Sequence, residues 1–411
     1  VGGAVFLLLY LVLVVLVGVT VMLGELALGR RSGKSAVSTY RGLSKKYTWL
    51  GYAGIVCGFC IMCFYFVLGG IVLRYAVGYF LAIFGGSEFA WSGQGTGFFG
   101  YFLTDTNSMI LFFVLYILLN ILVVSGGVQG GIEKFCNVGM PALFCLLVFI
   151  ILYIACQPGA AEGYKFMFSP DFSVFSNPEI GFGRVLKNAA GQMFFSLSIG
   201  LGVMMTYGSY LGKNENLPKN SVIIVISDTL VAIMAGLAVI PAAVANGIAK
   251  GMAVSDIKLG GPNLLFATLQ DVFHDMGTIG GIFGLIFYAL VLIAAISSAI
   301  SLIEAVSVTF IDHASAKGHE RDRNKVLAVV CLAITLLACL VAVDGLGSNG
   351  IAPKDLFHIN SKADWCADWL DFMDMISEGI AMPLGAMLMS IMVGWEIKPK
   401  SLYGEIDSGY N

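Results

Sequence analysis

The chain has 411 residues, of which 58% are hydrophobic and only 12% are charged. Its mean hydropathy is +0.87, whereas about a quarter of the residues of ordinary soluble domains are charged. The net charge of −3 gives no sign of a nucleic-acid partner. The composition excludes an ordinary soluble domain and predicts a protein embedded in a lipid bilayer.

Nine apolar stretches are long enough to cross a membrane, which takes roughly 20 helical residues. They cover residues 4–28, 49–84, 107–125, 137–157, 187–212, 219–246, 278–312, 325–343 and 370–395. Several are continuous apolar runs without the alternating pattern of barrel strands. We therefore expect an all-α integral membrane protein with about nine transmembrane helices.

Basic residues gather in the loops after the first, fifth, seventh and ninth stretches, and cytoplasmic loops carry an excess of Lys and Arg. They are Arg30, Arg31, Lys34, Arg41, Lys45, Lys46, Lys213, Lys219, Lys317, Arg321, Arg323, Lys325, Lys398 and Lys400. The loop before the last stretch is acidic and is expected outside. The chain then enters the membrane from outside at residue 1, and it opens on Val-Gly-Gly without methionine. We expect a further helix to precede it.

Cys57, Cys60 and Cys63 form a CxxCxxC pattern inside the second stretch. A metal or iron–sulfur site is one interpretation, but no fourth ligand lies near it in the sequence. Free cysteine commonly packs as a small apolar residue, which is the interpretation we favour. The chain has no Walker, Rossmann or HExxH motif, which argues against ATP-driven transport by this chain itself.

Charged residues inside membrane spans are costly and therefore mark functional positions by default. Those singled out here are Glu25, Arg74, Asp228, Glu304, Asp312 and Asp371. Arg74, Asp312 and Asp371 lie towards the ends of their stretches, where a side chain can reach water. The other three lie deeper, and either a hydrogen-bonded link between helices or a direct role with ion or substrate fits them.

The fifth stretch carries two hydroxyls, Ser196 and Ser198, followed by Gly200-Leu201-Gly202 at its middle. A helix with this pattern is prone to break there. Unwound carbonyls can coordinate a cation, and the N-terminal end of the second half-helix favours an anionic group such as a carboxylate. The alternative is close packing of an unbroken helix through small residues.

The seventh stretch contains Ala294-Ala295-Ile296-Ser297-Ser298, with adjacent hydroxyls in apolar surroundings. Hard oxygen ligands suit a small alkali cation. Serines in membrane helices more often hydrogen bond to their own backbone one turn back, and this alternative stays open on the residues alone.

Several motifs together resemble the neurotransmitter:sodium symporters, and in particular their bacterial amino-acid transporters. They are Gly2-Gly3-Ala4-Val5-Phe6, Gly24-Glu25-Leu26-Ala27-Leu28-Gly29-Arg30, Gly131-Ile132-Glu133-Lys134-Phe135, Met140-Pro141, Ser169-Pro170-Asp171-Phe172 and the segment from Gly191 to Tyr210. The resemblance covers essentially the whole chain. It implies a LeuT-type inverted-repeat helical bundle, here incomplete, with the nine stretches equivalent to the family's helices two to ten. The chain is then one transporter domain that lacks the first helix and the C-terminal end.

The resemblance assigns the substrate site by residue. It implies contact with an amino-acid substrate at Ile61, Tyr65, Phe195, Ser196, Ser198, Leu201 and Ser298. Tyr65 would meet the substrate carboxylate, and Phe195 would be the aromatic lid. Leu201 stands where many members have phenylalanine, which would leave extra room beside the substrate side chain.

The resemblance also implies two sodium sites, both incomplete without the first helix. The first would use Ser196 and Asp228, with Ser227 as the alternative to Asp228. The second would use Ala294, Ser297 and Ser298. Asp228 adds a fixed negative charge, and we hypothesise that it makes chloride unnecessary.

Asp312 resembles the acidic half of the inner gate, and Asp371 that of the outer gate, with arginine partners expected in the first helix. Glu25 is expected to hydrogen bond to the broken helix rather than to the ligand, and Glu304 is a buried carboxylate without an obvious partner. No covalent chemistry is expected, so the chain is not an enzyme.

These observations predict a multi-pass plasma-membrane transporter that couples sodium entry to uptake of an amino acid, apolar or aromatic, by alternating access. A proton-coupled carrier of the same fold, with Asp228 or Glu304 as proton carrier, is one alternative. A sensor that binds an amino acid without transporting it is another, and a membrane redox protein built on the cysteines is a third. The sequence does not define the oligomeric state.

Overall fold

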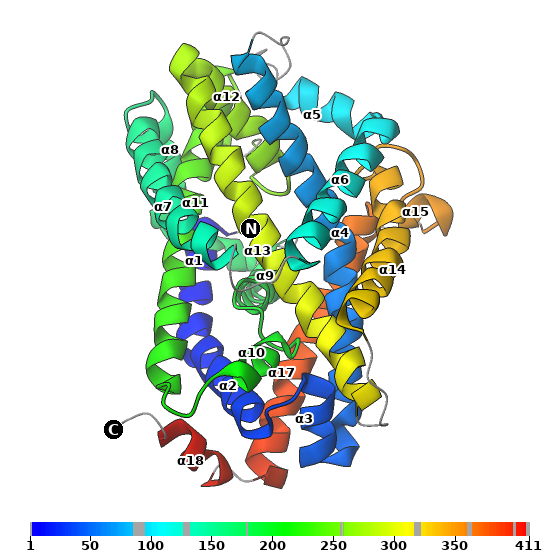
Figure 1. The fold of residues 1–411 in the computed structure, drawn as a ribbon. Helices are drawn as coiled ribbons and strands as arrows, with labels where there is room; N and C mark the ends of the chain where they lie inside the picture. Colours follow the sequence, from blue (N-terminus) through cyan, green and yellow to red (C-terminus); the bar gives the residue numbers. More distant parts are fainter. Residues whose placement is uncertain are drawn as a thin grey trace.

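The computed structural model describes residues 2–84, 95–125, 132–177, 180–254, 257, 259–315, 322–359, 364–397 and 400–407, and they are mostly helical (Figure 1). The first half contains α1 (Gly3–Leu13), η1 (Val14–Gly18), α2 (Val19–Ser32), α3 (Ala36–Leu43), η2 (Lys45–Tyr47), α4 (Thr48–Ile83), α5 (Gly95–Thr104), α6 (Thr106–Ser125), α7 (Ile132–Ala155), α8 (Ala160–Phe168), η3 (Phe172–Ser176), α9 (Gly181–Ser196) and α10 (Val203–Tyr210). The second half contains α11 (Leu217–Ala249), η5 (Leu264–Thr268), α12 (Leu269–Asp275), α13 (Thr278–Ser315), α14 (Arg323–Asp344), α15 (Pro353–Leu356), η6 (Asp364–Cys366), α16 (Trp369–Ile376), η7 (Ser377–Ala381), α17 (Met382–Ile391), η8 (Met392–Ile397) and α18 (Lys400–Asp407).

Within the described residues, eight helices are long and apolar enough to span a membrane. They are Gly3–Ser32, Lys45–Ile83, Thr106–Val123, Cys136–Ala155, Leu217–Ala249, Ile279–Ser315, Arg323–Asp344 and Trp369–Ile397. Each corresponds to one of the nine predicted stretches. The remaining stretch, 187–212, is divided between two shorter helices, α9 and α10. All nine predicted stretches are therefore helical, and the one predicted to break is broken.

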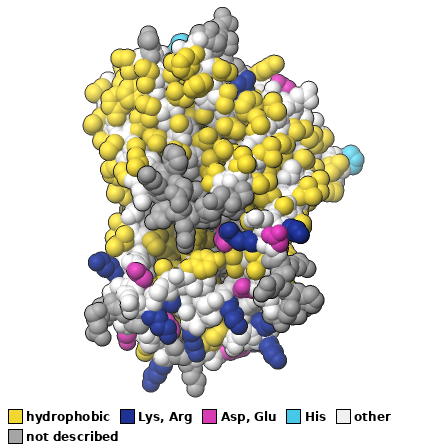
Figure 2. Space-filling model, viewed as in Figure 1, with side chains coloured by type: hydrophobic (Ala, Val, Ile, Leu, Met, Phe, Trp, Pro, Cys, Tyr) yellow, Lys and Arg dark blue, Asp and Glu magenta, His cyan; other side chains and the backbone are white. Residues whose placement is uncertain are grey.

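Several short helices lie at the two ends of the bundle. Figure 1 shows α5 and α12 at one end and α3 and α18 at the other. In the same view, Figure 2 shows hydrophobic side chains over most of the visible face, with Lys, Arg, Asp and Glu gathered towards the end that carries α3 and α18. This distribution supports a cytoplasmic assignment for that end. Gly131 and the basic residues Lys317, Arg321 and Lys398 lie outside the described residues.

Local sequence explains how several of these helices begin and bend. Asn216 caps α11, since its side-chain oxygen accepts a hydrogen bond from the Lys219 backbone N–H at 2.9 Å. Pro141 lies inside α7 and Pro241 inside α11, where each removes a backbone donor. Two long spans also contain π-helical segments, η1 in the first span and η7 and η8 in the last. These spans therefore depart from regular α-helices.

Glycines allow α2 and α10 to pack backbone against backbone. A Cβ added at Gly29 would lie 1.9 Å from the Met205 carbonyl oxygen, and one at Gly208 would lie 2.4 Å from the Leu26 carbonyl oxygen. No larger residue fits at either position without moving a helix. The inner half of the broken helix is thus held directly against α2.

Candidate functional site

The break between α9 and α10 is the structural centre of the site. Residues 197–202 join the two half-helices, and Ser198, Gly200 and Gly202 have positive φ angles of 52°, 87° and 79°. A Cβ at Gly200 would lie 2.3 Å from the Met382 carbonyl oxygen of α17. The Gly-x-Gly pattern thus supplies both the backbone conformation and the close approach of a neighbouring helix. The predicted break is confirmed.

Glu25 of α2 holds the unwound segment. The backbone N–H of Gly200 donates a hydrogen bond to Glu25 Oε1 at 2.7 Å, and the Glu25 residue is only 1% exposed. A backbone donor freed by the break therefore finds a buried carboxyl acceptor. This confirms the expectation that Glu25 hydrogen bonds to the broken helix.

The predicted substrate residues come from α4, α9, the unwound segment and α13. Tyr65 of α4 lies beside Ser298 of α13. The ring of Phe195 stacks on that of Phe64, with centroids 6.4 Å apart. Ile61 is buried one turn before Tyr65 on α4. Three helices distant in sequence thus contribute to one region.

Leu201 and Ser198 belong to the unwound segment itself. Leu201 is buried, and its carbonyl oxygen would lie 2.4 Å from a Cβ added at Gly54 of α4. The segment therefore packs tightly on the same helix that carries Ile61 and Tyr65.

The predicted residues of the first sodium site meet at the end of α9. Ser196 Oγ donates a hydrogen bond to Asp228 Oδ2 of α11 at 2.6 Å. The Ser227 side chain is exposed, so the geometry favours Asp228 over this alternative. Tyr10 of α1 and Thr229 lie in the same cluster. Sequence reasoning did not identify Tyr10, although a lone tyrosine in the run from Leu7 to Leu16 was a signal.

The predicted residues of the second sodium site lie on a single face of α13. Ser297 Oγ donates a hydrogen bond to the Ala294 carbonyl oxygen at 2.8 Å, so Ser297 makes the local backbone bond that is common for serines in membrane helices. Ser298 is exposed. These three residues are spaced three and four positions apart on one helix, and their hydroxyl and carbonyl oxygens are suitable ligands for an alkali cation.

The two predicted gate residues lie in different structural settings. Asp312 Oδ2 accepts a hydrogen bond from the Ser35 backbone N–H at 2.8 Å, which joins α13 to the start of α3. Asp371 lies in the first turn of α16, where its backbone N–H donates to Asp368 Oδ1 at 2.6 Å. Asp312 therefore links two elements at the end of the bundle that carries α3.

A second acidic pair, Asp374 and Glu378, was missed by sequence reasoning. The two carboxyls interact with each other, and Lys187 of α9 lies near them. A Cβ added at Gly191 of α9 would lie 2.4 Å from Glu378 Oε1, so this carboxyl touches the broken helix. Their spacing of four residues on a helix was the available signal.

Glu304 has a partner that the sequence did not indicate. Its Oε2 lies 2.8 Å from Nη2 of Arg323, the first residue of α14. The Glu304 side chain is 22% exposed, so the expectation of a buried carboxylate is wrong. The cause is its location in the last third of α13, close to the end of the bundle.

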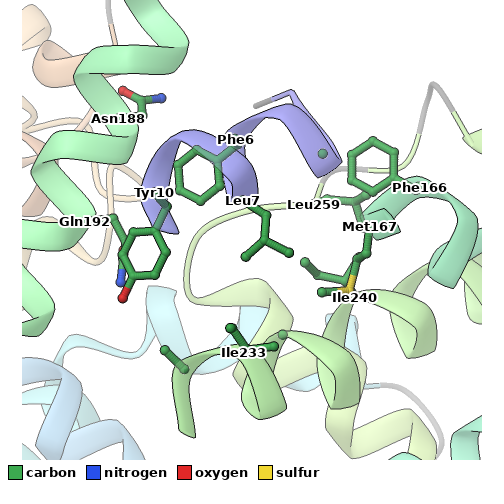
Figure 3. Close-up of a pocket in the computed structure, with 13 residues that line it drawn as sticks. Phe6, Leu7, Tyr10, Phe166, Met167, Asn188, Gln192, Ile233, Ile240 and Leu259 are labelled. Carbon is green, nitrogen blue, oxygen red and sulfur yellow. The ribbon is translucent and has the colours of Figure 1, made fainter. Parts of the chain in front are cut away.

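A cavity of about 390 Å³ lies between α1, α8, α9 and α11 (Figure 3). Its lining is largely apolar, with Tyr10, Asn188 and Gln192 as polar members. None of the predicted substrate residues lines it. The cavity instead adjoins the cluster of Tyr10, Ser196 and Asp228 described above.

A membrane bundle built around a discontinuous helix, with side-chain oxygen atoms gathered at the break, is the arrangement of a secondary transporter of the LeuT type. The family model of the sodium:neurotransmitter symporters matches residues 1–98 and 102–406. An uncharacterized sodium-dependent transporter of Bacillus subtilis, YhdH, is 31% identical over 412 residues, covering 100% of this chain and 84% of the relative. An uncharacterized sodium-dependent transporter of Haemophilus influenzae is 30% identical, covering 97% of this chain and 83% of its own length.

The crystal structure of MhsT in complex with L-phenylalanine superposes with a TM-score of 0.84 and 32% identity, covering 99% of this chain and 85% of that one. The chain belongs to the sodium:neurotransmitter symporter family. It is a sodium-dependent, multi-pass transporter of the cell membrane with a LeuT-type fold, not an enzyme.

Proposed function

We propose that this transporter couples the inward sodium gradient to uptake of one amino acid with an apolar or aromatic side chain. The observation that carries the proposal is the unwound segment 197–202, held by Glu25 and packed on α4 and α17. Free backbone groups and hydroxyls at such a break suit an ion together with an amino-acid carboxylate.

The pocket composition supports an apolar or aromatic substrate. Ile61, Phe195 and Leu201 offer no charged group to the substrate side chain, while Tyr65 and Ser298 offer hydroxyls for its carboxylate. The similar structure of MhsT holds L-phenylalanine. Leu201 leaves more room than a phenylalanine would, which suits a bulky side chain.

Two sodium sites are proposed. Ser196 and Asp228 contribute to the first, where the carboxylate offers both a ligand and a negative charge. Ala294, Ser297 and Ser298 contribute to the second. We propose that the charge of Asp228 replaces a bound chloride ion, so that transport needs none.

Transport itself follows from a shift between two populations of states. Sodium binding orders the unwound segment and completes the pocket, which favours an outward-facing, substrate-competent state. Asp371 then contributes to closing the outer gate, and Asp312 to opening the inner one. The contact of Asp312 with Ser35 is one that an inner gate at this end of the bundle would have to rearrange.

The experiment is uptake of a panel of labelled amino acids into proteoliposomes that contain the complete protein, in sodium against potassium. Sodium-dependent accumulation of apolar or aromatic amino acids supports the proposal. Uptake driven by a pH gradient regardless of sodium favours proton coupling, and binding without accumulation favours a sensor. Uptake restricted to acidic or basic amino acids contradicts the proposed substrate class.

A further inference from the structure

A chain of hydroxyl hydrogen bonds joins the inner half of the broken helix to α13. Tyr207 of α10 donates to Ser301 Oγ. Ser301 Oγ in turn donates to the Ser297 carbonyl oxygen at 2.9 Å. The two helices are 94 residues apart in sequence at this contact, so it is a tertiary link rather than a local one.

Both ends of this series of hydrogen bonds lead to residues that lie beside or within the proposed binding sites. Tyr207 lies in α10, a helix of eight residues that begins directly after the unwound segment. Ser297 is one of the proposed ligands of the second sodium site, and its hydroxyl donates to the Ala294 carbonyl oxygen. A displacement of α10 therefore acts on the part of α13 that would bind sodium.

The rigidity of α10 makes this link effective. Gly29 and Gly208 bring the backbones of α2 and α10 together, and the Met205 carbonyl would meet any Cβ at position 29. A helix packed in this way moves as a unit with its neighbour rather than bending. The position of the Tyr207 hydroxyl is thus set by the α2–α10 pair.

The hydrogen bonds have a consistent direction. Tyr207 donates to Ser301, and Ser301 donates to the Ser297 carbonyl, so each bond strengthens the next. The Tyr207 residue is 40% exposed, and we infer that water entering from the inner side can replace Ser301 as the partner of its hydroxyl. A bond that exchanges with water at little net cost is suited to being formed and broken in every cycle.

We propose that Tyr207 and Ser301 are positioning residues that couple the unwound substrate segment to the second sodium site. Sodium bound at Ala294, Ser297 and Ser298 favours the closed contact between α10 and α13. Loss of the Tyr207–Ser301 hydrogen bond accompanies inward release of the ion. This inference rests on the proposed sodium-coupled transport and adds a residue pair to which the resemblance assigned no role.

Charged groups lie further along the same helices, and Glu304 is close enough to Tyr207 to interact with it electrostatically. Glu304 is paired with Arg323 at 2.8 Å, and Asp312 accepts from the Ser35 backbone. Tyr210, one turn after Tyr207, lies near both carboxyls. A variant at Tyr207 therefore removes the hydroxyl link without removing any of these charges.

The test uses the complete protein in proteoliposomes and measures uptake against sodium concentration. For Tyr207→Phe and Ser301→Ala we expect the half-saturating sodium concentration to rise about three- to tenfold, the range expected for one hydrogen bond. The KM for the amino acid at saturating sodium should stay within about twofold. Ser301→Thr, which keeps a hydroxyl, should restore sodium affinity.

Controls and a second readout separate coupling from a structural role. Tyr52→Phe removes a hydroxyl that accepts from Arg41, and Ser209→Ala removes one that donates to the Thr206 carbonyl oxygen in its own helix, so neither should shift the sodium dependence. Binding of labelled sodium to purified protein without amino acid should weaken in Tyr207→Phe. The double variant Tyr207→Phe/Ser301→Ala should be no worse than either single one, since both break the same bond.

An unchanged sodium dependence in both single variants, with sodium-driven uptake intact in the wild type, would overturn the coupling role alone. Equal losses of sodium affinity and amino-acid affinity would show general damage to the fold and also overturn it. Sodium-independent uptake by the wild type would remove the proposed function and this inference together.

Discussion

The Gly200 backbone N–H donates a hydrogen bond to the buried Glu25 carboxyl at 2.7 Å, and this bond fixes the unwound segment to α2. The proposed substrate site depends on the conformation of this segment. Its side chains offer contacts to substrate, and Ser196, the last residue of α9 before it, is one of the proposed ion ligands. Three predictions test the contacts that hold it and the sites around it, and a fourth tests a buried contact that stabilises the fold.

Replacing Glu25 by alanine should abolish most transport. The variant leaves the Gly200 N–H buried without its acceptor, which costs about 1–3 kcal/mol, or roughly a 5- to 150-fold loss in the competent population. Glu25→Gln keeps an oxygen acceptor and should retain more activity. Uptake per protein in proteoliposomes distinguishes the two. Equal activity of Glu25→Ala and the wild type would exclude this role.

Gly200→Ala should be more harmful than its small size suggests. The residue has φ 87°, and the new Cβ would lie 2.3 Å from the Met382 carbonyl oxygen. The conformation alone costs about 1–2 kcal/mol for a residue with a Cβ, before the clash. We expect at least a tenfold loss of uptake. Gly42→Ala, at a helical position with nothing within 4 Å, is the matched control and should behave as wild type.

Asp228→Asn should weaken sodium binding while keeping the shape of the side chain. The amide loses the negative charge that would attract the ion but can still accept a hydrogen bond from Ser196. We expect the half-saturating sodium concentration to rise by about tenfold, the equivalent of roughly 1.4 kcal/mol. Replacing chloride by gluconate should leave wild-type uptake unchanged. A collapse of uptake in gluconate would contradict the proposed role of the Asp228 charge.

Arg30 should be important for stability rather than for ion binding. Its side chain is 1% exposed, lies 3.2 Å from Glu405 Oε2 of α18, and donates to the Glu215 carbonyl at 2.7 Å. Removing one partner of a buried ion pair typically costs about 3–5 kcal/mol. We therefore expect a clear decrease in the unfolding temperature of the Arg30→Ala variant, measured in detergent.

The matched control for this prediction is Lys213→Ala. Lys213 reaches the same Glu405 carboxylate at 3.9 Å, but its side chain is 78% exposed. An exposed pair contributes about 0–1 kcal/mol, so this variant should unfold close to the wild-type temperature. Equal shifts in both variants would mean that the buried contacts of Arg30 do not stabilise the fold.

The sequence predicted the membrane spans and the break well because both depend on local composition. Apolar length indicates a span, and Ser196 to Gly202 combine hydroxyls with glycines in a way that favours an interruption. The link from Glu25 to the broken helix was also predicted, although through family resemblance. Its donor, the Gly200 N–H, becomes known only once the conformation of the segment is known.

Contacts between distant helices could not be predicted in the same way. Two pairings depend on the rotation and offset of packed helices. They are the ion pair of Glu304 with Arg323 and the hydrogen bond of Tyr207 to Ser301. Apolar spans give weak information on both, because lipid-facing and core-facing side chains are equally hydrophobic. The pair of Asp374 and Glu378 was missed for the same reason, since nothing in the sequence indicates that it faces Gly191.

The most direct test of the central claim is coupled flux in proteoliposomes with the complete protein, measured as entry of labelled sodium before and after an external amino acid is added. The account predicts that phenylalanine or another apolar or aromatic amino acid accelerates sodium entry, and that Asp228→Asn reduces this acceleration. Amino-acid entry that leaves sodium entry unchanged would contradict sodium-coupled symport.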